Sequence, residues 1–406
     1  MTQPLEQDEC AVLIVGAGPT GLLLACLLAR RGVEVRVLER RAAPAGSSRA
    51  IGLHPPALRV LAELGLDGEA AARGERVRIG RARGRGRELG TVDFARAGMR
   101  PPFVLTLPQS RTEELLAAHL AQLAPAALRR GWEVTDLREA ASTATVTARR
   151  SGGSGALRMR AGLVVGADGS RSRIRELLGI GTLGRDYPDT YLMGDLDDPA
   201  GDPDVPAAQR EAIIHLEPGG VVESFPLPGG ARRWVVHTGT DGAGPSPERL
   251  VSLVRERTGV VLEPGSCTML SAFTVRRRTA RRLRSRRCVL LGDAVHEVSP
   301  IGGQGITLAW LDALELAPLL ARHVTERRAD ALHHDPVWRR AERRIRRRAR
   351  RAGMIAAANT VLGRPAGSRA AALRELAVRA ALRTPLRRGL AWVYAMGWAR
   401  TGRRTR

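Results

Sequence analysis

Glycines recur with regular spacing in the segment GAGPTG, which places Gly16, Gly18 and Gly21 in the pattern G-x-G-x-x-G. The apolar run CAVLIVG precedes this segment and TGLLLACLLARRG follows it, which predicts a buried strand, a turn and a helix. Such glycines permit close approach of the backbone to a pyrophosphate, which the positive end of the helix attracts. Glu39 ends the next strand-like run, VEVRVLE, where a carboxylate accepts hydrogen bonds from ribose hydroxyls. The spacing therefore predicts a dinucleotide site.

Two further segments end an apolar run in Gly and Asp. LVVGADGSRSRIRELLGI spans residues 163–180 with Asp168 and Gly169, and CVLLGDAVHEVSPIGGQG spans residues 288–305 with Gly292 and Asp293. Each begins as an apolar strand. A pyrophosphate site alone does not distinguish FAD from NAD, so these two segments decide which dinucleotide is expected.

Taken together and in this chain order, the three segments resemble the fingerprints of class A FAD-dependent monooxygenases, the p-hydroxybenzoate hydroxylase-like family of aromatic-ring and polyketide hydroxylases. The resemblance covers about residues 10–320. It implies non-covalently bound FAD, NADPH or NADH as reductant, and O2 as co-substrate. It also implies that a flavin hydroperoxide passes one oxygen atom to a small aromatic, polyketide or phenolic-lipid substrate, which is hydroxylated or epoxidised.

The resemblance also implies which residues contact the cofactor. Gly16, Gly18, Gly21 and Glu39 would hold the adenosine half of FAD, and Asp293 would bind its ribityl or ribose hydroxyls. Asp168 and Gly169 would serve both FAD and NAD(P)H. The other positions expected around the cofactor are Arg40, Arg49, Gln109, Arg111 and Gly292.

The segment PIGGQG is expected to pass along the flavin ring. The resemblance assigns catalysis to Pro300, Gly302 and Gly303, without a side-chain base, and adds Gly303, Gln304, Gly305 and Ile306 as cofactor contacts. Small residues let backbone amides approach the ring, and the N-terminus of the following helix stabilises negative charge on reduced flavin. Thr307 stands where the family commonly has Asn.

Several other polar residues have simpler explanations than catalysis. His54 and His296 match family positions, but such histidines usually pack or hydrogen-bond within a protein. Asp312 is as consistent with helix stabilisation as with a role in a site. His215 and His237 fall in short strands whose alternation does not reveal the buried face.

The positive charge of the chain comes from arginine alone. With 65 Lys+Arg against 41 Asp+Glu the net charge is +24, and the sequence contains no lysine. A flavin-dependent halogenase relays hypohalous acid through a lysine, so that class is excluded. The aromatic content of 3% offers few stacking platforms, which favours solvated helix faces over a nucleic-acid partner. The four scattered cysteines indicate neither a metal site nor disulfides.

The strands and helices expected around these residues indicate an α/β fold in three parts. We expect a Rossmann-like FAD-binding domain from residues 1–75, 96–180 and 276–320, and a mostly antiparallel substrate-binding sheet domain from residues 76–95 and 181–275. Residues 321–406 form a basic C-terminal helical region. A capping box of Ser110 and Glu113 is expected to open a helix over residues 110–124. The acidic N-terminus and the lack of an apolar run of about 20 residues predict a cytoplasmic protein.

Two alternatives stay open. An FAD-dependent oxidase or a prenyl-chain reductase on the same fold would carry the same motifs. A membrane-surface binding protein is the other, because Leu373, Leu376 and Leu382 mix with arginines at helical spacing before Trp392, which suits peripheral membrane contact. A helix that packs on the FAD-binding domain is the simpler explanation of this pattern. The oligomeric state does not follow from the sequence.

Overall fold

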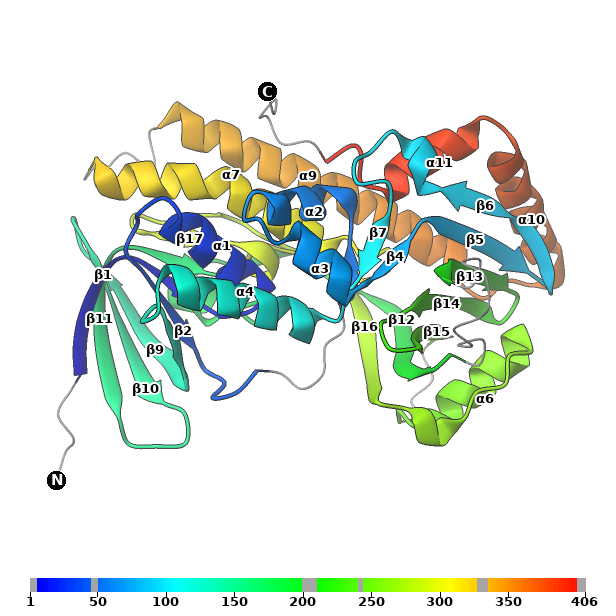
Figure 1. Ribbon diagram of the computed structural model, residues 1–406, viewed down its shortest axis with the longest axis horizontal. Coiled ribbons are helices and arrows are strands. Elements are labelled where there is room, and N and C mark those ends of the chain that lie inside the picture. Colours follow the sequence, from blue (N-terminus) through cyan, green and yellow to red (C-terminus); the bar gives the residue numbers. More distant parts are fainter. Residues whose placement is uncertain (1–5, 45–49, 199–209, 240–243, 327–334, 400–406) are drawn as a thin grey trace.

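Two large β-sheets lie beside each other, with long helices along one side of both (Figure 1). The computed structural model describes residues 6–44, 50–198, 210–239, 244–326 and 335–399. The first sheet contains the strands that precede the glycine-rich segments, and the second contains the short strands between residues 182 and 280.

The first sheet has seven strands in the order β8-β2-β1-β11-β10-β9, with β17 paired to β11. These strands are β1 (Glu6–Val15), β2 (Val35–Glu39), β8 (Leu128–Arg130), β9 (Trp132–Glu139), β10 (Ala144–Arg150), β11 (Ala156–Gly166) and β17 (Cys288–Leu290). β1 pairs in parallel with β2 and β11, and β11 pairs in parallel with β17. Val15 lies opposite Gly166, which lies opposite Leu290. The three glycine-rich segments therefore leave the sheet at one edge.

Helices cover this sheet and fix the turn after β1. They are α1 (Pro19–Ala29), α2 (Pro55–Ala62), α3 (Asp67–Arg73), α4 (Gln109–Leu123), α5 (Arg173–Leu177) and α7 (Gly305–Thr325). α1 packs against both α4 and α7, so every residue from Leu22 to Leu28 is buried and the helix has no polar face. The indole N–H of Trp310 in α7 donates to the Pro19 carbonyl at 3.1 Å. A small sheet of β3 (Gly52–Leu53), β7 (Val104–Thr106) and β4 (Glu75–Val77) lies alongside.

The second sheet has eight strands in the order β18-β16-β12-β15-β14-β13-β5-β6. Its strands are β5 (Ile79–Gly84), β6 (Arg87–Asp93), β12 (Thr182–Asp197), β13 (Ala212–Glu217), β14 (Gly220–Pro226), β15 (Ala231–Gly239), β16 (Met269–Ala280) and β18 (His296–Glu297). Neighbouring strands are antiparallel apart from β13 with β5. The helix α6 (Pro247–Thr258) covers one face through Leu250 and Val254. The connections in the described ranges include the 3₁₀-helices η1 (Phe94–Ala97), η3 (Pro264–Ser266) and η4 (Gly292–Ala294).

This mixed α/β architecture confirms the predicted fold class. The division into domains stays a prediction. One expected boundary, between residues 275 and 276, falls inside β16, which continues to Ala280. β16 pairs with β18, whose residues directly follow η4, so the strand links the two parts of the molecule.

Between residues 335 and 399 the C-terminal region contains α9 (Pro336–Gly363), α10 (Ser368–Arg383) and α11 (Leu386–Tyr394). α9 lies along α7 and its far end approaches the second sheet (Figure 1). The expectation that the tail packs on the FAD-binding domain holds only in part, because α10 and α11 pack on β6 of the second sheet, whereas Met396 and Trp398 after α11 join the core of the first. Gly90 of β6 makes room there for the buried side chain of Leu382. No helix within the described ranges is long and apolar enough to cross a membrane.

Candidate functional site

A cavity of about 1130 Å³ extends between the two parts of the molecule. One end is lined by the carboxyl edge of the first sheet, including Gly16, Glu39 and Asp168. The other end is lined by the face of the second sheet that α6 leaves uncovered, and by residues of α9, α10 and α11. The carboxyl edge of parallel strands is where open α/β sheets bind ligands.

Close backbone contacts hold the first glycine-rich turn. Gly16 has a φ of +106°, and a Cβ there would lie 2.5 Å from the carbonyl oxygen of Ala167. A Cβ on Gly21 would lie 2.0 Å from the Gly16 carbonyl oxygen. Gly18 differs, because a Cβ there would meet nothing within 4 Å and Gly18 lines the cavity at the N-terminus of α1. Packing therefore requires Gly16 and Gly21, whereas Gly18 leaves the positive end of α1 open to an anion.

Glu39 ends β2 beside this turn and is buried. Its Oε2 accepts the backbone N–H of Ala17 at 2.9 Å, and its Oε1 accepts the backbone N–H and the Nε–H of Arg41, each at 2.9 Å. Burial acts to raise the pKa of Glu39, but these hydrogen bonds outweigh it and hold the pKa below its usual value. The carboxylate is therefore ionised at neutral pH and available as an acceptor for hydroxyl groups.

Asp168 is engaged within the protein. Its Oδ1 accepts the Ser172 hydroxyl at 2.6 Å, and its Oδ2 accepts the N–H of Ile174 at 3.0 Å in the first turn of α5. Burial raises the pKa of Asp168, and these hydrogen bonds offset part of that rise. Gly169, with a φ of +83°, turns the chain away and lines the cavity beside Asp168. The Asp168 carboxylate is therefore largely engaged, and the segment offers a ligand the backbone around Gly169 and the side chains of Arg171 and Arg173.

Asp293 lines the cavity in η4, directly after β17. Its side chain is reached by solvent inside the cavity, yet protein surrounds it, and this desolvation raises its pKa although nearby His296 acts to lower it. No hydrogen bond or ion pair joins its carboxylate to another residue in the part of the chain that the structure describes. Gly292 does not line the cavity. A Cβ on Gly292 would lie 3.2 Å from Thr20 Cγ2, so this glycine packs against the start of α1.

The loop Pro300–Gly305 turns sharply where the two parts of the cavity meet. Gly302 and Gly303 have φ values of +93° and +63°, and the N–H of Gly303 donates to the Pro300 carbonyl at 2.9 Å. A Cβ on Gly303 would lie 3.6 Å from His54 Nε2, and a Cβ on Gly302 would lie 3.3 Å from Asn359 Nδ2. The loop therefore lies between α2 on one side and α9 on the other, and positive φ favours glycine at both positions.

Most of the predicted site residues meet at this cavity. Those that line it are Gly16, Gly18, Glu39, Arg40, Gln109, Asp168, Gly169, Asp293, Pro300, Gly302, Gly303, Gly305 and Ile306. Arg49 lies outside the described residues. Gly21 and Gly292 do not line the cavity but pack against the residues that do, Gly16 and Thr20 respectively.

Arg111 and Gln304 do not line the cavity. The Arg111 side chain is 63% exposed and pairs with Glu114 at 3.0 Å. Arg111 follows Gln109 by two residues in α4, which turns its side chain about 200° around the helix, to the opposite face. Gln304 is buried at the start of α7, and its side-chain oxygen and nitrogen have no hydrogen-bond partner within the described residues.

The expected capping box of α4 is wrong. The helix begins at Gln109 with Pro108 as its N-cap, so Ser110 lies inside the first turn. Glu113 instead accepts a hydrogen bond from the Gln109 side chain at 2.8 Å. The Leu-Pro sequence before Gln109 fixes an extended backbone and starts the helix earlier than the hydroxyl pattern predicted.

His54 is the histidine that lines the cavity within the described residues. Burial lowers its pKa to about 4, so the ring is neutral at neutral pH. The backbone N–H of His54 donates to the hydroxyl of Thr307 at 3.4 Å. Thr307, which stands where the family commonly has Asn, therefore makes a structural contact.

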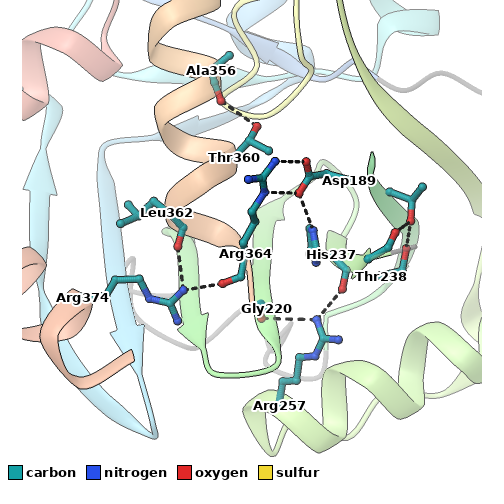
Figure 2. A network of polar contacts seen from close by, with 12 residues as sticks. Asp189, Gly220, His237, Thr238, Arg257, Ala356, Thr360, Leu362, Arg364 and Arg374 are labelled. Carbon is teal, nitrogen blue, oxygen red and sulfur yellow. Dashed lines mark hydrogen bonds and ion pairs between the residues drawn. The ribbon is translucent and has the colours of Figure 1, made fainter. Parts of the chain in front are cut away.

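The other histidines that the structure describes lie away from the cavity lining. His296 pairs with Asp312. His237 Nε2 lies 3.1 Å from Asp189 Oδ1, and the same carboxylate binds Arg364 just beyond α9 (Figure 2). These contacts indicate structural roles, including an attachment of α9 to β12.

The chain matches the family described as FAD binding domain over residues 9–350. It belongs to this family. FAD is therefore the cofactor of the protein, as predicted. The relatives of this flavoprotein are monooxygenases by name, which confirms the resemblance to class A FAD-dependent monooxygenases.

The flavoprotein is similar to 6-methylpretetramide 4-monooxygenase from Streptomyces rimosus, with 38% identity over 326 residues that make up 78% of this chain and 57% of that protein. It is 35% identical to rifampicin monooxygenase from Streptomyces venezuelae over 77% of this chain and 64% of that protein. The chain thus spans about three fifths of the length of these relatives.

Two solved structures extend the comparison. Anhydrotetracycline hydroxylase from Streptomyces rimosus matches 96% of this chain and 76% of its own, with a TM-score of 0.76 and 30% identity. p-Nitrophenol 4-monooxygenase from Pseudomonas putida matches 97% of this chain and 98% of its own, with a TM-score of 0.84. Its identity of 22% limits that likeness to the fold.

The residues at the cavity suit FAD. The uncapped N-terminus of α1 at Gly18 matches a pyrophosphate, and the ionised Glu39 beside it matches ribose hydroxyls. Within the Pro300–Gly305 loop, Gly302 and Gly303 present backbone without side chains, as close approach to a planar ring requires. Gln304 adds a buried amide that lacks a partner among the described residues.

Sequence reasoning missed the far half of the cavity. Its lining is largely apolar and comes from the second sheet, through Met193, Ile214, Leu216, Val221, Phe225, Val235 and Phe273. Glu223 lies among these side chains. The alternation of Val221, Glu223 and Phe225 along β14 places all three on one face, and this period-two pattern was the available signal.

Proposed function

We propose that the protein is a monooxygenase that uses NADPH or NADH and O2 to hydroxylate, or epoxidise, a small aromatic, polyketide or phenolic-lipid substrate. The observation that carries this proposal is the single cavity that joins the glycine turn at Gly18 to an apolar wall around Phe225. When bound, FAD takes electrons from the nicotinamide and activates O2 for transfer of one oxygen atom. The names of the similar proteins, 6-methylpretetramide 4-monooxygenase and anhydrotetracycline hydroxylase, support the substrate class.

The first half of the cavity would hold the cofactor. Gly18 and the N-terminus of α1 would receive the pyrophosphate, and Glu39 would accept hydrogen bonds from the adenosine ribose. Asp293 would accept hydrogen bonds from the ribityl or ribose hydroxyls, because its carboxylate faces the cavity without a protein partner in the described chain.

The loop Pro300–Gly305 would position the substrate against the flavin ring. Gly303 approaches His54 of the first half, and Gly302 approaches Asn359 of α9, so the loop borders both halves. The absence of side chains on Gly302 and Gly303 leaves the backbone as the surface that faces the reacting groups. The apolar wall of the second sheet would exclude water from the reaction.

The reduced nicotinamide would dock transiently. The chain has one G-x-G-x-x-G segment that joins a parallel strand to a helix, at residues 16–21, and FAD occupies it in this proposal. A second match to the pattern, GIGTLG at residues 179–184, leads into the strand β12 and offers no helix N-terminus. Arg171 and Arg173 line the cavity beside Gly169, and their positive charge suits a dinucleotide phosphate. We therefore expect NADPH or NADH to bind at the surface around Asp168 and Gly169.

The test is oxidation of NADPH or NADH by the FAD-loaded protein with phenolic and polyketide compounds, in isotopically labelled O2. A matching substrate should accelerate nicotinamide oxidation and emerge with one labelled oxygen atom. Stoichiometric hydrogen peroxide with a merely dehydrogenated product would instead identify an oxidase. Saturation of a prenyl chain without O2 uptake would identify a reductase.

We further propose peripheral membrane contact through the C-terminal helices. Leu373, Leu376 and Leu386 are exposed, and exposed arginines such as Arg379 and Arg383 lie near them in sequence. Sedimentation with phosphatidylserine vesicles tests this, and the double substitution Leu373→Ser, Leu376→Ser should weaken binding. Equal sedimentation of both proteins would argue against it.

A further inference from the structure

Glu223 occupies an unusual position in β14. Its side chain lines the apolar half of the cavity and the residue is 8% exposed. In the register of the sheet its neighbours are Val235 of β15 and Ile214 of β13, and both of these line the cavity as well. A carboxylate thus stands in the middle of an apolar wall.

No hydrogen bond or ion pair joins Glu223 to any other residue that the structure describes. The other charged group nearby on this face, Arg233 of β15, is held by Asp195 of β12 through bonds of 2.6 and 2.7 Å. The hydroxyl of Tyr394 in α11 donates to Asn359 at 3.1 Å, so its proton is used. An unpaired carboxylate in an apolar wall is unfavourable for the free protein, which points to a partner that arrives with the ligand.

We infer that Glu223 selects aromatic substrates that carry a hydroxyl group, by accepting a hydrogen bond from that hydroxyl. This inference rests on the proposed function, because it takes the apolar half of the cavity as the substrate site. The aromatic ring would pack against Phe225, Val235 and Phe273, while the hydroxyl reaches the one acidic side chain of β14. Discrimination arises because an ether or an unsubstituted ring would leave the buried carboxylate unpaired.

The electrostatics of the wall agree with this role. Burial alone raises the pKa of Glu223 to about 7, with no compensating cation. The groups that face it from neighbouring elements are the hydroxyls of Tyr191 in β12 and Tyr394 in α11, and burial followed by the Glu223 charge raises the pKa of each. Glu223 is thus mostly ionised above neutral pH, when it accepts hydrogen bonds most strongly, and protonated below it.

The experiment compares 2-naphthol with 2-methoxynaphthalene, two ligands of one ring system that differ in the hydroxyl proton. Their dissociation constants from the FAD-loaded protein are measured by fluorescence near pH 8, where a phenol is neutral. The variants are Glu223→Leu, Glu223→Gln and the control Glu263→Gln, an exposed residue of the same part of the chain. Glu223→Leu replaces the carboxylate with an apolar side chain. Glu223→Gln keeps the shape of the side chain and serves as the second variant if the leucine disturbs folding.

The wild type and Glu263→Gln should bind 2-naphthol about tenfold or more tighter than the ether. Glu223→Leu should bring the ratio of the two affinities close to one, mainly because 2-naphthol binds more weakly. Glu223→Gln should give an intermediate ratio. The wild-type preference should also decline as the pH falls below about 7. If the wild type and Glu223→Leu bind both ligands with the same ratio of dissociation constants, the role of Glu223 is overturned but the proposed substrate site is not. Binding of neither ligand to the wild type would overturn the placement of the substrate site and the inference with it.

Discussion

The Nε2 of His296 lies 2.6 Å from Oδ2 of Asp312, and both side chains are buried. Oδ1 of Asp312 accepts two further bonds from Arg348 of α9, at 2.8 and 3.2 Å. Burial opposes the charges, but Arg348 and His296 hold the pKa of Asp312 below its usual value, and Asp312 holds the pKa of His296 above its own. Of the two explanations open for Asp312, these contacts favour the structural one.

Asp312→Asn should destabilise the protein strongly. The substitution keeps the shape of the side chain but leaves Arg348 and His296 without their shared anion. Breaking a buried charge cluster in this way costs about 3–5 kcal/mol, which urea unfolding at neutral pH would measure. Asp136→Asn is the control, because its pair with Arg138 is largely exposed, and it should change stability by about 0.5 kcal/mol or less. Similar losses in both variants would contradict the structural role of Asp312.

His296 and His215, both of which are buried, should affect stability with opposite pH dependence. The raised pKa of His296 means that its contribution to stability is complete below its usual pKa of 6.5 and is lost as the pH rises through the higher folded value. Burial lowers the pKa of His215 to about 4, so its contribution is complete above 6.5 and is lost as the pH falls from 6.5 towards 4. Unfolding of His296→Gln and His215→Gln across this range checks both signs. Parallel pH profiles would refute the assignment.

Asp293→Ala should weaken FAD binding. The loss of a hydrogen bond to a charged acceptor costs about 1.5–3 kcal/mol, or about ten- to a hundredfold in affinity. Flavin fluorescence titration of the apoprotein gives the dissociation constant. The control Asp136→Ala lies on β9 with an exposed side chain and should bind FAD as the wild type does. An unchanged affinity in Asp293→Ala would remove this residue from the FAD site.

Gly18→Ala and Gly21→Ala should separate cofactor binding from folding. A Cβ at Gly18 meets nothing within 4 Å, so the alanine variant should keep its melting temperature but lose FAD affinity by obstructing the N-terminus of α1. A Cβ at Gly21 would lie 2.0 Å from the Gly16 carbonyl oxygen, so that variant should melt at lower temperature. Calorimetry without and with FAD distinguishes the two effects. Normal FAD affinity in Gly18→Ala would exclude this approach of the cofactor.

Glu223→Gln should stabilise the ligand-free protein near pH 8. The folded pKa of about 7 lies above the usual 4.5, so the ionised carboxylate opposes folding increasingly as the pH rises from 4.5 to 7. The difference in unfolding free energy should approach about 3 kcal/mol above this window and vanish below it. Glu263→Gln, whose side chain is exposed, should show no such trend. A flat difference across the pH range would mean that Glu223 has a partner in the folded chain.

Local patterns were sufficient to predict the cofactor half of the cavity. The strand, turn and helix around Gly16 and Gly21 follow from apolar runs and glycines that are close in sequence, and parallel pairing then brings Asp168 and Asp293 to the same edge. The orientation of Arg111 was not predictable in this way, because it depends on where α4 begins, and Pro108 moves that start.

The far half of the cavity required information that no local pattern holds. Its wall combines β13, β14 and β15 with β12 and β16, and the face that each strand buries follows from pairing between distant segments. Likewise, α10 packs on β6 because Gly90 leaves room for Leu382, a contact between residues about 290 positions apart. Such contacts depend on shape complementarity, which composition and periodicity do not specify.

α9 is attached by two arginines, one near its middle and one at its C-terminus. Arg348 binds Asp312 of α7 in the first part of the molecule, and Arg364, at the C-cap, binds Asp189 of β12 in the second sheet. These 16 residues of helix span about 24 Å. Deletion of one residue between them would shorten that span by about 1.5 Å and rotate Arg364 by about 100°, away from its carboxylate. The number of residues between Arg348 and Arg364 therefore sets the distance at which α9 holds Asp312 of α7 from Asp189 of β12.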